Sequence, residues 1–90
     1  GRTVLAYLRT TEEEAILVVL NLGMRETDAF ALGSRESPLA PGRYTARDLL
    51  TGDEAEALVV AEGGAVEGYQ PVPVLAPQGA LILEMAPALP

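Results

Sequence analysis

Carboxylates are the first side chains of this chain that could carry chemistry, because acidic residues outnumber basic ones and histidine and cysteine are both absent. Asp48 and the adjacent pair Asp53 and Glu54 are candidates for general acid–base catalysis. Such catalysis needs two carboxyl groups whose surroundings push their pKa values apart. The neighbouring residues supply neither the apolar pocket nor the charges for that. We therefore expect surface carboxylates near turns and no catalytic site.

The chain also lacks the residues needed for a metal site, a nucleophilic site or a phosphate-binding loop. Thr51–Glu54 offers too few oxygen ligands for a calcium loop, and a chain without cysteine or histidine lacks the usual zinc ligands. Ser34 and Ser37 have no histidine to activate them. The pair Gly63-Gly64 is not accompanied by the lysine and helix of a phosphate-binding loop. We expect no metal, no cofactor and no catalytic residue.

Stacking on sugar rings is the remaining chemistry that these side chains could perform. The chain has no tryptophan, three tyrosines and one phenylalanine. Tyr7 lies within an apolar segment, so we expect its ring in the core with the hydroxyl at the rim. Tyr44 and Tyr69 are the candidates for an exposed sugar-stacking platform. The alternative is that both rings cover the hydrophobic core.

The charge of the chain argues against anionic partners. Its net charge is −7, and lysine is absent, so every cation is an arginine. Such a surface binds phosphate backbones poorly, and we expect neither nucleic acid nor membrane as a partner. No apolar segment approaches the roughly 20 residues that a membrane span requires.

The longest apolar segment, Ala15–Leu22, predicts a buried strand. It is short, rich in β-branched residues and followed by Gly23, and its lack of alternation predicts that both faces are covered. Thr3–Arg9 precedes it across a short polar link, so the two segments predict an antiparallel hairpin. A helix beginning at Thr11 is the rival interpretation, but the β-branched content disfavours it.

The rest of the chain predicts five further strands between turns. Pro71 and Pro73 cannot donate to a ladder, which places their strand at a sheet edge. Gly33–Gly42 is predicted as a loop, and Ala86–Pro90 as a frayed tail. The predicted strands are Glu26–Leu32, Arg43–Leu50, Asp53–Ala61, Ala65–Leu75 and Ala80–Met85.

Asp53–Ala61 is the ambiguous segment among them. Its alanine and glutamate content favours a helix, as does the capping box formed by Thr51 and Glu54. Leu58-Val59-Val60 favours a strand instead.

About seven short strands with turns every 8–12 residues predict an antiparallel β-sandwich, with residues 1–90 as a single domain. The apolar segments exceed what one core can bury, so one sheet face should remain apolar and serve as an interface. We assign one face to Ile16, Val18, Leu20, Leu81 and Leu83, and the other to Leu17, Val19 and Ile82. The sequence leaves open which of the two faces the core.

Four segments in order carry a family resemblance. They are Val4–Arg9 (VLAYLR), Ile16–Leu22 (ILVVLNL), Tyr44 with Asp48–Gly52 (DLLTG), and Leu75–Leu83 (LAPQGALIL). Together they resemble the C-terminal β-domain of the alpha-amylase family of glycoside hydrolases, which act on starch-like glucans. The nearest likeness is to α-glucosidase, oligo-1,6-glucosidase and trehalose-synthase-like members.

The resemblance implies a Greek-key sandwich that follows a catalytic (β/α)8 barrel. It implies a strand after the DLLTG segment, so we expect a strand at Asp53–Ala61. The catalytic residues of the family lie in the barrel, so this chain is expected to be a non-enzymatic fragment of a longer glycoside hydrolase or transglycosylase. Its expected partner is that barrel, which it would pack on and stabilise. The alternatives are a carbohydrate-binding module for α-glucans, a stand-alone interaction sandwich, and self-association through an apolar sheet face.

Overall fold

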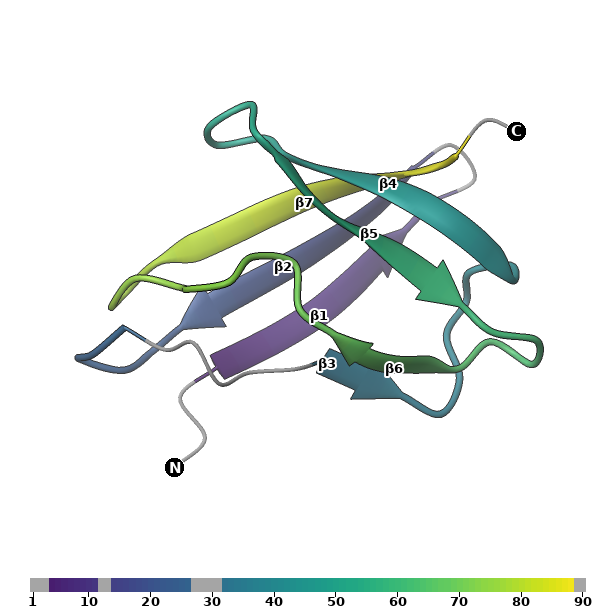
Figure 1. Cartoon of the computed structure of the whole chain (residues 1–90), viewed down its shortest axis with the longest axis horizontal. Coiled ribbons are helices and arrows are strands. Elements are labelled where there is room, and N and C mark those ends of the chain that lie inside the picture. The colour runs from purple at the N-terminus through teal and green to yellow at the C-terminus, as the bar shows by residue number, and fades with distance from the viewer. Residues whose placement is uncertain (1–3, 12–13, 27–31, 89–90) are drawn as a thin grey trace.

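The computed structural model describes residues 4–11, 14–26 and 32–88, and these residues form antiparallel strands without a helix (Figure 1). No helix within these ranges could therefore cross a membrane. The predicted antiparallel β-sandwich of seven strands is confirmed. The strands are β1 (Val4–Thr10), β2 (Ala15–Asn21), β3 (Leu32–Ser34), β4 (Gly42–Asp48), β5 (Glu54–Val60), β6 (Val66–Tyr69) and β7 (Ala80–Pro87).

The strands form two sheets of unequal size. The larger has the order β1-β2-β7-β4-β5, and the smaller pairs β3 with β6. Figure 1 shows the small sheet lying across one face of the large one. β7 lies between β2 and β4, so the middle of the large sheet pairs the last strand of the chain with an early one. This non-sequential order is typical of a Greek key.

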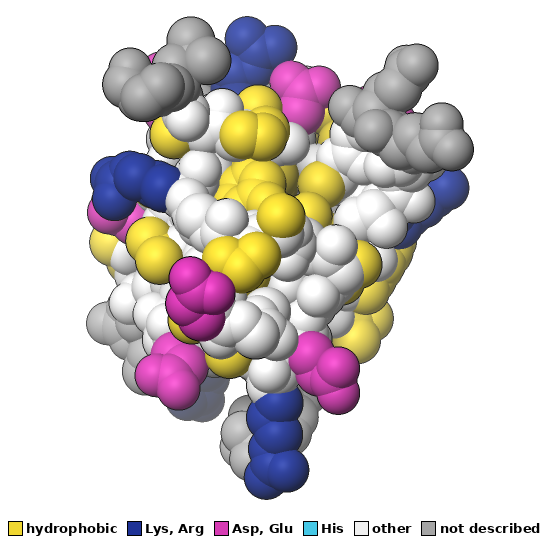
Figure 2. All heavy atoms as spheres, turned by 90° about the vertical axis from the view of Figure 1, so that its right-hand side faces the viewer, with side chains coloured by type: hydrophobic (Ala, Val, Ile, Leu, Met, Phe, Trp, Pro, Cys, Tyr) yellow, Lys and Arg dark blue, Asp and Glu magenta, His cyan; other side chains and the backbone are white. Residues whose placement is uncertain are grey.

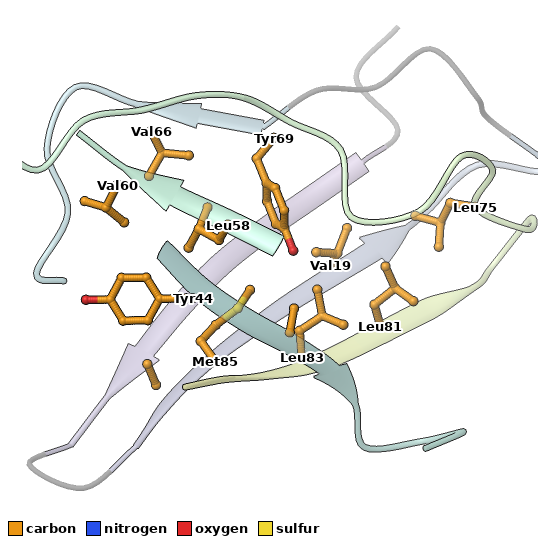
Figure 3. Close-up of a cluster of buried hydrophobic side chains, with 12 residues drawn as sticks. Val19, Tyr44, Leu58, Val60, Val66, Tyr69, Leu75, Leu81, Leu83 and Met85 are labelled. Atoms are coloured by element: carbon orange, nitrogen blue, oxygen red, sulfur yellow. The ribbon is translucent and has the colours of Figure 1, made fainter. Parts of the chain in front are cut away.

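The core lies between the sheets and is mostly aliphatic. Val19 and Leu83 have no exposed surface. The register pairs Leu17 with Leu83 and Val19 with Leu81, and paired residues share a face. Figure 3 shows this core, whose labelled members are Val19, Tyr44, Leu58, Val60, Val66, Tyr69, Leu75, Leu81, Leu83 and Met85.

The predicted grouping of residues by face is wrong. Leu81 and Leu83 share the core face with Leu17 and Val19, whereas Ile82 shares the outer face with Val18. Alternation along a strand shows which residues of that strand point the same way. Only the register between two strands shows which of their faces coincide, and a shift of one residue reverses the assignment.

The ambiguous segment is a strand, as expected from the resemblance. β5 pairs with β4, but the register shifts between Tyr44 and Ala46. This irregularity adds a residue to β5, as in a β-bulge. Leu58 and Val60 are consequently buried while Val59 is exposed.

Other predicted strand boundaries differ from those that the structure shows. The predicted strand Glu26–Leu32 lies mostly outside the described residues, and β3 takes Gly33 and Ser34 from the predicted loop. β6 ends at Tyr69, before the first proline of its predicted segment. The predicted frayed tail is corrected, because β7 continues to Pro87 and the Ala88 N–H donates to the Arg43 carbonyl at 2.9 Å.

Candidate functional site

The two tyrosines predicted to stack on sugars are core residues. Tyr44 is 8% exposed and Tyr69 is 6% exposed, and Figure 3 shows both rings among aliphatic side chains. The Tyr44 hydroxyl donates to the Ala40 carbonyl at 2.6 Å, and the Tyr69 hydroxyl donates to the Glu56 carbonyl at 2.7 Å. Burial, and secondarily the negative charge of Glu56, raises the pKa of Tyr69 well above its usual value. Stacking requires an open ring face, so these positions do not fit the predicted platform.

The prediction that the Tyr7 ring lies in the core is wrong. Its side chain is 47% exposed, and it is paired with Val18 on the outer face of the large sheet. Its neighbours Ala6 and Leu8 instead pack against the core. An apolar segment on an edge strand therefore placed the aromatic ring outside and the smaller side chains inside.

The candidate carboxylates form no catalytic pair. Asp48 is buried rather than exposed, which corrects its prediction as a surface residue. Its carboxylate accepts hydrogen bonds from the Leu50 N–H at 3.0 Å, the Thr51 hydroxyl at 3.2 Å and the Ile82 N–H at 3.3 Å. Asp53 and Glu54 are exposed on the far side of the same turn. Asp48 thus ends β4 and holds the turn against β7.

Metal and nucleophile sites are also unsupported by the geometry. No group of three or more acidic side chains is placed to hold a metal ion within the described ranges. A cavity of about 310 Å³ lies between the two sheets and includes Ser34 and Ser37 in its lining. The rest of that lining is largely aliphatic, and the chain has no histidine to activate a serine.

Asn21 is a structural residue that sequence reasoning did not single out. It is 1% exposed at the end of β2. Its amide nitrogen lies 2.9 Å from the Arg25 carbonyl oxygen and 3.0 Å from that of Ala76, and its Oδ1 accepts from the Gly23 N–H at 2.9 Å. The sequence did contain a signal for this role, namely a polar residue at the end of an otherwise apolar strand. Such a side chain must find hydrogen-bond partners when it is buried.

The outer face of the large sheet holds the strongest candidate surface. Leu5, Leu20 and Ala80 form one row across β1, β2 and β7, and Tyr7, Val18 and Ile82 form the next row. Leu49 lies beside this second row, because its N–H donates to the Ile82 carbonyl at 2.8 Å. We call this surface the apolar half-face, defined by Leu5, Tyr7, Val18, Leu20, Leu49 and Ile82.

A charged row bounds the apolar half-face. Arg9 on β1 is paired with Ile16 on β2, and Ile16 is paired with Glu84 on β7. Glu84 is in turn paired with Arg47 on β4, and Arg47 with Glu54 on β5. Figure 2 views the end of the molecule toward which β1 runs, where charged side chains of both signs surround a small apolar centre. The outer face therefore changes from apolar to charged along the strand direction.

The half-face has substantial surface left uncovered. Leu5 and Tyr7 are each 47% exposed, and Leu49 is 47% exposed at the other side. Val18, in the middle, is 9% exposed because its neighbours surround it. A contiguous apolar surface with a charged border is typical of a protein interface.

Comparison with known families assigns this fold. A family model described as the C-terminal domain of maltogenic amylase matches residues 1–59, which is 59 of the 90 residues. The matched part runs from β1 almost to the end of β5 and includes five of the six half-face residues. Searches of curated proteins and of solved structures gave no match. The chain belongs to the family of maltogenic amylase C-terminal domains, the non-catalytic C-terminal domains of alpha-amylase family enzymes.

Proposed function

We propose that residues 1–90 are the accessory domain of an enzyme acting on α-glucosidic bonds, and that the apolar half-face docks on its catalytic (β/α)8 barrel. The supporting observation is the uncovered apolar surface on a domain whose family is defined by its place in a larger enzyme. Docking removes this surface from water on both partners. The domain thereby stabilises the barrel without taking part in the reaction.

The size of the effect follows from the exposed fractions. Burying a large aliphatic or aromatic side chain completely contributes about 1.5–3 kcal/mol. Leu5, Tyr7 and Leu49 are about half exposed, so each contributes about 1 kcal/mol on docking. Together the three residues contribute about 3 kcal/mol, a substantial part of the roughly 5–15 kcal/mol by which a domain is usually stable.

The test is a charge placed in the half-face of the full-length enzyme. Tyr7→Arg introduces a cation where docking would exclude water, and at 47% exposure it leaves the interior of the sandwich intact. The matched control is Val59→Arg, which changes a 57% exposed apolar residue on β5, outside the half-face. We expect Tyr7→Arg to lower the melting temperature of the enzyme by several degrees, and Val59→Arg to leave it nearly unchanged. Equal effects of the two variants would refute docking through this surface.

An α-glucan-binding function has no comparable support. The two tyrosines proposed for sugar stacking have covered rings. Titrating the chain with maltooligosaccharides while following tyrosine fluorescence checks this alternative, and saturable binding would restore it. We expect no binding, because a sugar ring finds no exposed aromatic platform at Tyr44 or Tyr69.

A further inference from the structure

The cavity between the two sheets lies where the small sheet leaves part of the large one uncovered. β3 and β6 have 3 and 4 residues, whereas the strands of the large sheet have 7 or 8. Half-buried side chains of Ala6 and Leu8 on β1 and of Leu17 on β2 line the cavity. Its volume is about 310 Å³, which is roughly twice that of a cavity known to bind benzene. It therefore has room for an aromatic ring with a short side chain.

The floor of the cavity is apolar and already formed. The lining residues Leu58, Val66 and Tyr69 are buried, and Figure 3 shows their side chains close together. The hydrogen bond from the Tyr69 hydroxyl to the Glu56 carbonyl fixes the orientation of the ring. A largely apolar cavity of this size with a few polar groups is typical of a site for a small molecule.

The Ser37 hydroxyl is the polar group in this lining that lacks a partner. Its oxygen is buried and makes no hydrogen bond within the part of the chain that the structure describes. The hydroxyl of Ser34, which also lines the cavity, donates to the Glu36 carbonyl. A buried hydroxyl without a partner lowers the stability of the fold. A ligand with a hydrogen-bonding group would satisfy Ser37 and recover that loss.

The backbone around Ser37 is held in position by the rest of the fold. Gly64 is buried at a φ of 92°, and a Cβ there would lie 3.2 Å from the Ser37 carbonyl oxygen. The two backbones are therefore in close contact. Further along the same loop, Leu39 packs against the core, and the Ala40 carbonyl accepts the Tyr44 hydroxyl at 2.6 Å. A hydroxyl on a fixed backbone loses little conformational freedom when a ligand binds.

We propose that this cavity binds a small uncharged alcohol, whose aryl or alkyl group lies on the apolar floor and whose hydroxyl pairs with the Ser37 Oγ. Glu36 is the one charged residue of the described lining, and it is exposed. Together with the net charge of −7 it disfavours a carboxylate ligand. The site does not depend on the proposed docking, because Ala6, Leu8 and Leu17 lie on the inner face of the large sheet.

The test follows fluorinated probes by fluorine NMR in the presence of the full-length enzyme. The probes are para-fluorophenethyl alcohol, para-fluoroethylbenzene, which lacks the hydroxyl, and para-fluorophenylacetate, which is an anion. We expect the alcohol to bind saturably and the anion not to bind. Ser37→Ala should weaken binding of the alcohol about tenfold and leave that of the hydrocarbon unchanged. No saturable binding of the alcohol, or an equal effect of Ser37→Ala on both probes, would overturn the inference.

A matched pair of variants locates the bound probe within the enzyme. Ala6→Leu adds an isopropyl group inside the cavity, whereas Ala57→Leu adds the same group to a half-buried alanine of β5 that is not in the lining. We expect Ala6→Leu to abolish binding of the alcohol and Ala57→Leu to retain it. Binding that survives Ala6→Leu would place the probe elsewhere and refute the site. Melting curves show whether each variant is folded, and if Ala6→Leu is not, the smaller change Ser37→Ala decides.

Discussion

Buried polar side chains fix the ends of the strands in this domain. Asn21 lies in the segment ILVVLNL and Asp48 in the segment DLLTG, two of the segments that carry the family resemblance. Asn21 binds backbone groups of the turns after β2 and before β7, and Asp48 binds those of the turn after β4 and of β7 itself. Backbone groups buried away from water need such partners. The resemblance therefore reflects, in part, how the turns are held.

Residue types limit the chemistry that the chain could perform, but they do not fix where each side chain lies. A chain without histidine and cysteine lacks the usual base for activating a serine and the usual zinc ligands. The placement of each tyrosine could not be predicted in the same way, because Tyr44 and Tyr69 stand at inward positions of short strands and Tyr7 at an outward one. Whether an aromatic residue is buried depends on the opposite sheet, which a local sequence pattern does not describe.

The buried Tyr69 predicts an alkaline loss of stability. Its pKa is raised in the folded chain, while in the unfolded chain it lies near the ordinary value of about 10. The folded state then holds its proton more tightly, so this contribution is fully present below about pH 10 and is lost as the pH rises further. The expected slope is up to about 1.4 kcal/mol per pH unit. Urea unfolding at pH 9, 10 and 11 measures it.

Tyr69→Phe is the matched variant for this slope. It removes the titrating hydroxyl and its hydrogen bond to Glu56, at a cost of about 1 kcal/mol at neutral pH. Between pH 10 and 11 the variant should lose less stability than the unmodified chain. Parallel pH profiles for the two proteins would contradict the assignment to Tyr69.

At the scale of elements, seven strands could be predicted, but their mutual arrangement could not. Hydrophobic content and turn residues located β1, β2, β4, β5 and β7 to within two residues, including the hairpin of β1 and β2. In contrast, β6 ends six residues before its predicted segment does, and β3 shares only Leu32 with its predicted segment. Local propensity did not decide β5, where alanine and glutamate favour a helix, and the family resemblance resolved it. The pairing of β7 with both β2 and β4 joins distant parts of the chain. Local sequence patterns therefore could not predict its register, nor which sheet face Leu81 and Leu83 occupy.

Gly79, which immediately precedes β7, is required by close packing. A Cβ at this position would lie 2.7 Å from the Ala76 carbonyl oxygen, a backbone atom that cannot move aside without opening the turn. The Gly79 N–H donates to that carbonyl at 2.8 Å, and the Gly79 carbonyl accepts from the Asn21 N–H at 2.9 Å. We expect Gly79→Ala to lower the free energy of unfolding by about 3 kcal/mol through overpacking and weakened hydrogen bonds.

Gly63→Ala is the control for Gly79→Ala. Gly63 has a positive φ of 89°, but a Cβ there would meet no atom within 4 Å. Its replacement should cost only the backbone strain of about 1–2 kcal/mol. Urea unfolding measures the loss of stability in each variant. A larger loss for Gly63→Ala than for Gly79→Ala would show that the close approach to Ala76 does not determine the cost of a side chain at Gly79.

At the scale of the whole molecule, the sequence correctly predicted an excess of apolar surface. In three predicted strands the residues of both faces were apolar. A two-layer sandwich buries only one face of each sheet, so some of these side chains had to remain outside the core. The structure places the excess on the outer face of β1, β2 and β7. Its border with the charged row of Arg9, Glu84 and Arg47 depends on register and could not be read from the sequence.

The 90-residue chain, separated from its enzyme, is expected to self-associate through the apolar half-face. Exposed apolar patches of this kind drive association, whereas the net charge of −7 opposes it. Sedimentation velocity over a concentration series should show dimers that Tyr7→Arg abolishes and Val59→Arg retains. Raising the salt from 0.1 M to 1 M shortens the Debye length from about 10 Å to about 3 Å and screens the repulsion, so apolar association should strengthen. Weaker association at high salt would mean that charged residues, and not the half-face, hold the dimer together.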